Sequence, residues 1–144
     1  MKKYLIILAL LTGWITVSAQ VKLDWEQLTD VKYNEQYSEE LGSYTNVPVF
    51  GSSVKALSNK VVEISGYVIP LDVKQDLYVL SANPYATCFF CGGAGPETVM
   101  DLKFVKIPRK FRTDEKIRVK GVLKLNATDI YQLTYILDKA VLVK

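Results

Sequence analysis

Histidine is absent from the 144 residues, and this absence removes several common kinds of active site. Without imidazole there is no Ser-His-Asp or Cys-His catalysis, no histidine metal ligand and no histidine-based pH sensing. An excess of one charge is also missing, because 18 Lys and Arg residues against 15 Asp and Glu residues give a net charge of only +3. The sequence therefore lacks the strongly basic character typical of nucleic-acid-binding proteins.

The composition is that of one globular domain. Hydrophobic residues make up 49% of the chain and charged residues 23%, which excludes a disordered, collagen-like or coiled-coil protein. Basic residues are concentrated in residues 103–124. There Lys116, Arg118 and Lys120 alternate with other residues, so the pleat of a strand turns all three to one side. We interpret this cluster as a solvated strand face and a charged turn, and expect no nucleic-acid partner.

The first nineteen residues have the pattern of a secretory signal peptide. A basic start, Met1-Lys2-Lys3, precedes the apolar run Tyr4 to Leu11, and Val17-Ser18-Ala19 places small residues before a cut at Gln20. The apolar run is shorter than the ~20 residues that a membrane-spanning helix needs. We therefore expect an exported protein, periplasmic or extracellular, that is soluble after cleavage and does not span a membrane.

Residues 20–58 are predicted to form a partly helical extension packed on the rest of the domain. Asp24 is a suitable N-cap for a short helix whose apolar face carries Trp25, Leu28 and Val31. Tyrosine and leucine residues continue this spacing as far as Tyr44, although polar residues and glycine weaken the helix. A further short helix is expected around residues 54–57.

From Lys60 onward, β-branched residues and a period of two predict strands. Five segments fit this pattern: residues 61–69, 77–82, 100–107, 116–125 and 131–143. Gly66 and Gly121 interrupt two of them and predict bends. A block of five antiparallel strands, two of them bent, favours a small closed barrel over residues 59–144.

The barrel segment resembles an OB-fold in two motifs. These are V-x-I-x-G-Y-V-I-P, from Val62 to Pro70, and I-x-V-x-G-V-L, from Ile117 to Leu123. The resemblance implies a five-stranded OB-like barrel with an N-terminal extension.

More narrowly, the chain is similar to an uncharacterised family of exported bacterial OB-like proteins with a Cys-containing loop. Many relatives have one Cys, a His two residues later and then a proline run. Here Cys88 is present, Phe90 stands at the His position and Cys91 begins the segment that replaces the prolines. The family carries no agreed activity, so the resemblance bears on the fold rather than on function.

The loop of residues 83–97 contains both cysteines of the chain, Cys88 and Cys91, in a CxxC pair. The pair is followed by residues with special backbone properties: Gly92, Gly93, Gly95 and Pro96. Glycine permits positive φ and close backbone approach, and proline restricts the path of the chain. A loop of this composition holds one particular shape, as a ligand site or a contact with a second chain requires.

The first interpretation of this loop is a site for a soft divalent metal, with zinc as the expected ion. Cys88 and Cys91 would supply two thiolates, which leaves two of zinc's four positions to fill. Glu97 is the nearest acidic candidate, and Asp101, water or the same two cysteines of a second chain are the alternatives.

Other interpretations of the cysteine pair stay open. It can be a thiol–disulfide redox site, although the glycines after Cys91 do not continue a helix that would stabilise a thiolate. It can be a small structural disulfide in an oxidising compartment. Phosphate binding by the glycines is disfavoured, because the Lys-Ser/Thr step of a P-loop is missing.

The sequence thus predicts an exported OB-like binding protein whose Cys loop binds zinc, and it favours binding over catalysis. An alternative is an interaction module in which Tyr67, Tyr78 and Tyr85 contact a ligand on the barrel face. The expected partner is an unidentified envelope protein or a second copy of the chain, joined through the Cys loop.

The signal-peptide pattern predicts that the mature protein begins at Gln20 and is recovered without detergent, because residues 1–19 are removed during export. N-terminal sequencing of the protein from the producing cells checks this. A chain that still begins at Met1 and sediments with the membranes would contradict it.

Overall fold

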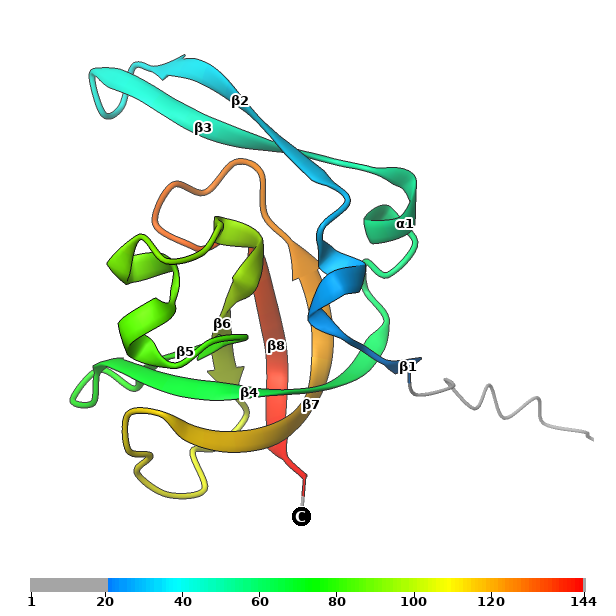
Figure 1. The fold of residues 1–144 in the computed structure, drawn as a ribbon, viewed down its shortest axis with the longest axis vertical. Coiled ribbons are helices and arrows are strands. Elements are labelled where there is room, and N and C mark those ends of the chain that lie inside the picture. The colour runs from blue at the N-terminus through cyan, green and yellow to red at the C-terminus, as the bar shows by residue number, and fades with distance from the viewer. Residues whose placement is uncertain (1–20, 144) are drawn as a thin grey trace, which may run out of the picture.

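The computed structural model describes residues 21–143, so the predicted signal peptide and Gln20 lie outside the described residues. Within this range the chain forms a barrel with a hairpin at one end (Figure 1). The strands are β1 (Val21–Lys22), β2 (Val31–Ser38), β3 (Ser43–Phe50), β4 (Val61–Asp72), β5 (Leu77–Ser81), β6 (Val99–Phe104), β7 (Glu115–Leu125) and β8 (Tyr135–Leu142). The helical elements are η1 (Trp25–Leu28), α1 (Ser52–Lys55), η2 (Tyr85–Thr87), η3 (Phe89–Cys91) and η4 (Pro96–Thr98).

Five strands close the barrel in the order β4-β5-β6-β8-β7, and β7 pairs with β4 to complete the ring. The predicted β-rich closed barrel is therefore confirmed. The expectation of an all-antiparallel block was wrong, because β6 and β8 run parallel. The strand that follows β6 in the chain, β7, pairs with β4 instead of with β6. The last strand, β8, then lies between β7 and β6, antiparallel to β7 and parallel to β6. The short β1 adds to β4, also in parallel.

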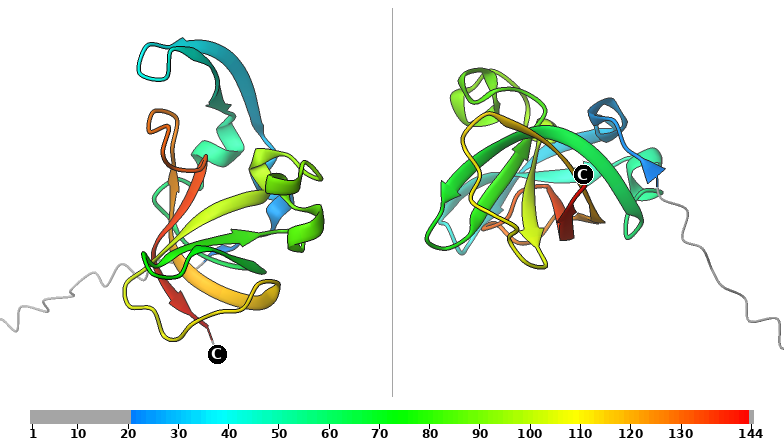
Figure 2. Two further views of the ribbon diagram at one scale, coloured as in Figure 1. Left: turned by 90° about the vertical axis from the view of Figure 1, so that its left-hand side faces the viewer. Right: turned by 90° about the horizontal axis from the view of Figure 1, so that it is seen from below.

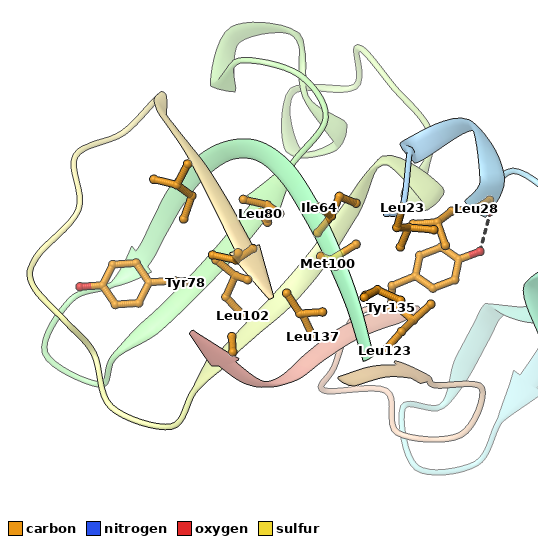
Figure 3. Close-up of a cluster of buried hydrophobic side chains, with 14 of the residues drawn as sticks. Leu23, Leu28, Ile64, Tyr78, Leu80, Met100, Leu102, Leu123, Tyr135 and Leu137 are labelled. Atoms are coloured by element: carbon orange, nitrogen blue, oxygen red, sulfur yellow. Dashed lines mark hydrogen bonds between the residues drawn. The ribbon is translucent and has the colours of Figure 1, made fainter. Parts of the chain in front are cut away.

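The barrel interior is filled by side chains that alternate along each strand. Val62, Ile64 and Val68 point inward from β4, and neighbouring strands contribute Leu80, Met100, Leu102, Leu123 and Leu137. Figure 3 shows six of them meeting between the strands: Ile64, Leu80, Met100, Leu102, Leu123 and Leu137. Tyr135 closes one end of this core and donates a hydrogen bond of 2.6 Å from its hydroxyl to the carbonyl of Leu28 in η1. This bond fixes the N-terminal segment onto the barrel.

Gly66 and Gly121 lie in the two long, strongly curved strands β4 and β7 (Figure 1). A Cβ on Gly66 would lie 2.6 Å from the carbonyl oxygen of Ser81, and one on Gly121 would lie 2.7 Å from that of Asp138. The register between β7 and β8 also shifts at Gly121. Glycine is therefore required at both places because a neighbouring strand passes too close for any side chain.

The prediction of a partly helical N-terminal extension was wrong, because residues 31–50 form an antiparallel hairpin, β2–β3. The hairpin projects beyond the barrel in Figure 1 and in the left view of Figure 2. Tyr37 and Tyr44 are directly opposite across it, with ring centroids 5.5 Å apart. Their separation of seven residues fits two helical turns, but it equally fits a cross-strand pair around a turn. Gly42, at φ +61°, supplies that turn.

Short helical turns do occur at the two places where the sequence predicted the start of a helix and a further short helix. The predicted helix after Asp24 is a single 3₁₀ turn, η1, in which the Gln27 side chain accepts from the Asp24 backbone N–H at 2.9 Å. The helix expected around residues 54–57 is α1 (Ser52–Lys55), which buries Val54. Among residues 21–143 no helix has the length and apolar character needed to cross a membrane.

The close approach at Gly66 predicts that Gly66→Ala destabilises the barrel. Replacing glycine by alanine in a strand ordinarily gains about 0.5–1 kcal/mol, whereas the overlap with the Ser81 carbonyl costs about 1–3 kcal/mol. Urea unfolding should therefore show a lower free energy of unfolding. Ser65→Ala, at an exposed neighbouring position, is the matched control and should change little. A Gly66→Ala protein as stable as the parent would refute the strand contact.

Candidate functional site: the Cys loop and the groove on the outer face of the barrel

The loop that contains both cysteines, residues 82–98, lies on the outside of the barrel (Figure 2). Beneath it, Ile69, Val79 and Val99 point outward from β4, β5 and β6 and form a second apolar cluster with Cys88. Phe89 and Leu133 pack against the edge of this cluster. The outer face of these strands is therefore apolar where the Cys loop covers it.

The backbone of the loop explains two of its glycines without a ligand. The carbonyl of Cys88 accepts from the N–H groups of Cys91, at 3.2 Å, and Gly93, at 3.1 Å. Gly92 ends η3 in the left-handed region, at φ 74°. A Cβ on Gly93 would lie 2.6 Å from the carbonyl oxygen of Thr87. These glycines are needed by the turn itself, so their presence is not evidence for a bound group.

The turn brings the two thiols next to each other while giving them different surroundings. Cys88 is fully buried and Cys91 is exposed, and both are free thiols. Desolvation, followed by the charge and hydrogen bond of Cys88, raises the pKa of the Cys91 thiol. A thiol with a raised pKa is protonated at neutral pH. A raised pKa is the opposite of the lowered pKa that activates cysteines for thiol–disulfide exchange.

Glu97, the acidic ligand expected from the sequence, is not brought together with the sulfurs. Its carboxylate lies over Gly95, and its charge adds to the burial that raises the pKa values of Tyr33 and Tyr135. Pro96 begins η4, the short helical turn that carries Glu97. Across residues 21–143, no group of three or more His, Cys, Asp or Glu side chains is arranged to hold a metal ion.

The three tyrosines proposed as a binding surface lie in different environments. Tyr78 is inside the barrel, at the opposite end of the core from Tyr135 (Figure 3), and its buried hydroxyl has no hydrogen-bond partner among residues 21–143. Tyr67 is half-buried, with the ammonium group of Lys116 5.7 Å from its ring centroid. Tyr85 is exposed in the Cys loop, where its backbone N–H donates to Asp114 at 2.7 Å.

Sequence reasoning missed a groove on the outer face of β5 and β6, at the other end from the Cys loop. It has a volume of about 610 Å³. Its apolar lining includes Leu77, Val105 and Tyr131, which are 49%, 69% and 78% exposed, and Lys103 and Lys106 also line it. The outward positions of the strands give part of this lining, but its other wall comes from residues far along the chain.

That second wall is the loop of residues 126–134, which side chains of β6 hold in place. Asp101 accepts from the backbone N–H of Leu133 at 2.9 Å, and Lys103 donates to the Gln132 side chain at 2.6 Å. Burial raises the pKa of Asp101, an effect that the hydrogen bond from Leu133 partly opposes. At its far end the loop is closed by Asn126, whose side-chain oxygen accepts from the N–H of Asp129 at 2.9 Å.

The comparisons with known proteins agree on fold alone. The sequence matches no family model, and no curated protein matches it. The structure is similar to the crystal structure of a DUF3299 family protein from Pseudomonas aeruginosa PAO1, with a TM-score of 0.53 and 16% sequence identity. The match covers 88% of this chain and 97% of that protein. The similarity therefore concerns the overall fold.

The anchoring of the second wall predicts that Asp101→Ala loosens residues 126–134. Losing the acceptor leaves the Leu133 N–H unsatisfied, which costs about 1–3 kcal/mol. Hydrogen exchange at the Leu133 amide should therefore become roughly 5- to 150-fold faster. Asp101→Asn keeps an acceptor oxygen and should stay near the parent rate.

The Leu123 amide serves as the internal control, because it donates to Lys60 on another part of the barrel. Its exchange should not change in either variant. Unaltered exchange at Leu133 in Asp101→Ala would show that the loop is held in some other way.

Proposed function

We propose that this chain is an exported OB-fold binding protein. The strand order β4-β5-β6-β8-β7, with β6 parallel to β8 and β7 closing onto β4, supports the OB-fold assignment. In OB-folds the second and third strands form the ligand-binding face, flanked by the loops between strands one and two and between strands four and five. The equivalents here are β5, β6, residues 73–76 and the loop 126–134.

The observation that carries this proposal is the coincidence of the groove with that face. The groove lies on the outer side of β5 and β6 and is bordered by Asp76 in one flanking loop and Tyr131 in the other. When a ligand covers the exposed apolar side chains of such a groove, apolar surface is removed from water, and this favours binding.

The lining indicates the class of ligand. Leu77, Val105 and Tyr131 offer an apolar surface, and the basic residues Lys103 and Lys106 line the same groove. An amphipathic anion fits both features, with its apolar body against the first set and its negative group near the second. We therefore propose a small amphipathic anion, or an envelope component that presents one, as the ligand of the groove.

A second proposed function is binding of a soft metal by the Cys loop, as the sequence indicated. The specific observation in its favour is that the turn from Cys88 to Cys91 places two free thiols side by side, one of them open to solvent. Thiol redox chemistry is less well supported, since the pKa of Cys91 is raised rather than lowered.

The proposed groove predicts that the chain binds 8-anilinonaphthalene-1-sulfonate, an apolar ring system with one sulfonate, and that changes in the lining weaken this binding. Val105→Asp places a carboxylate against the apolar body and should reduce affinity at least tenfold, about 1.4 kcal/mol. Lys106→Glu should also weaken binding, because it replaces attraction of the sulfonate by repulsion. Fluorescence titration of the folded variants measures both effects.

Matched substitutions outside the groove distinguish a site from general surface adsorption. Val141→Asp introduces the same charge at an exposed position of β8, and Lys60→Glu makes the same charge reversal near the start of β4. Both should bind the dye as the parent does. Equal losses in the groove variants and in these controls would refute the groove as the binding site.

A further inference from the structure

The Cys88–Cys91 pair is a site with two thiols and an apolar floor. The two residues are the first and last of a single hydrogen-bonded turn, in which the Cys91 N–H donates to the Cys88 carbonyl at 3.2 Å. Cys91 faces solvent, while Cys88 is buried against Ile69, Val79 and Val99. An ion captured between the sulfurs would be reached from solvent on the Cys91 side and enclosed by hydrocarbon on the other.

The number of available ligands limits which ion this site suits. Zinc takes four ligands in tetrahedral geometry, and two thiolates leave half of its positions empty. Within the described residues no third or fourth His, Cys, Asp or Glu side chain, Glu97 included, joins the pair in a group that could hold a metal ion. The apolar neighbours of Cys88 also offer no oxygen ligand for a hard ion.

A soft, singly charged ion has different requirements. Cu(I) prefers thiolate and thioether ligands, and two thiolates on opposite sides satisfy it in a linear arrangement. Such a complex has no open position that must be filled by water. It is therefore compatible with the hydrocarbon around Cys88, where a water molecule completing a zinc site would lack polar partners.

We propose that Cys88 and Cys91 of one chain bind a single Cu(I) ion as its two ligands. This inference rests on the proposal that the Cys loop binds a soft metal, and it names the ion and the coordination. Binding displaces one proton from each thiol, so that two protons are released and a copper complex of net charge −1 forms, with no change in the oxidation state of copper or sulfur. Because both thiols must lose a proton to bind the ion, Cu(I) affinity should fall as pH falls.

The experiment is an anaerobic Cu(I) titration of the reduced full-length mature protein, with ascorbate present and bicinchoninate as a coloured competitor. We expect one Cu(I) per chain, a monomer by gel filtration, and two sulfur neighbours of copper by X-ray absorption spectroscopy. Cys91→Ser should weaken binding at least 100-fold, because one sulfur alone remains. Cys91 is exposed, so this variant should keep the parent's circular dichroism spectrum.

Glu97→Gln is the matched control and should bind Cu(I) as the parent does, since within the described residues Glu97 does not join the two cysteines in a group that could hold a metal ion. A parallel zinc titration separates the possible failures. Retention of zinc without retention of Cu(I), or copper bound by three or four sulfurs in a dimer, would overturn the two-thiolate Cu(I) site while leaving soft-metal binding intact. Binding of neither metal above the Cys91→Ser level would overturn both proposals.

Discussion

The pairing of β4 with two partners is the constraint on which the barrel depends. Residues 61–68 of this strand pair with β7, and residues 67–72 pair with β5, so one strand belongs to both sides of the ring. The change of partner occurs next to Gly66, where the strand passes close to Ser81. Closure removes the free edges of an open sheet and encloses a single apolar interior. The N-terminal segment is fixed to this interior by the bond between Tyr135 and Leu28.

Closure also creates an outer face that is available for binding. Because side chains alternate along a strand, the same β4, β5 and β6 that fill the interior present Ile69, Val79 and Val99 outward. The Cys loop covers one end of this face, and the loop 126–134 borders the groove at the other. Asp101 connects the two ends, since it pairs with Val79 in the sheet and accepts the Leu133 N–H in the groove wall. The two proposed binding sites therefore lie on one face of the barrel but are formed by different residues.

Within the described residues, the β2–β3 hairpin is joined to the barrel by side-chain contacts and not by strand pairing. Its strands pair only with each other, and a two-stranded hairpin alone is marginally stable in water. Its attachment comes from near its open end, where Phe50 packs on Tyr135 with ring centroids 5.9 Å apart. At the tip, the Tyr131 hydroxyl donates to Glu40 at 3.1 Å. The hairpin thereby touches the same loop that forms the second wall of the groove.

The sequence by itself determined the strands of the barrel and the special backbone of the Cys loop, because both follow from local chemistry. Period-two patterns located the five strands, and Gly66 and Gly121 marked the places where two of these strands were expected to bend. The tertiary structure decided which residues that are far apart in the chain contact one another. It alone paired β6 in parallel with β8 and turned Tyr37 and Tyr44 into a cross-strand pair rather than one helical face. It also left Glu97 outside any group that could hold a metal ion within the described residues, and it formed a groove from residues between 71 and 132. Packing of distant segments leaves no local signal in the residues that it brings together.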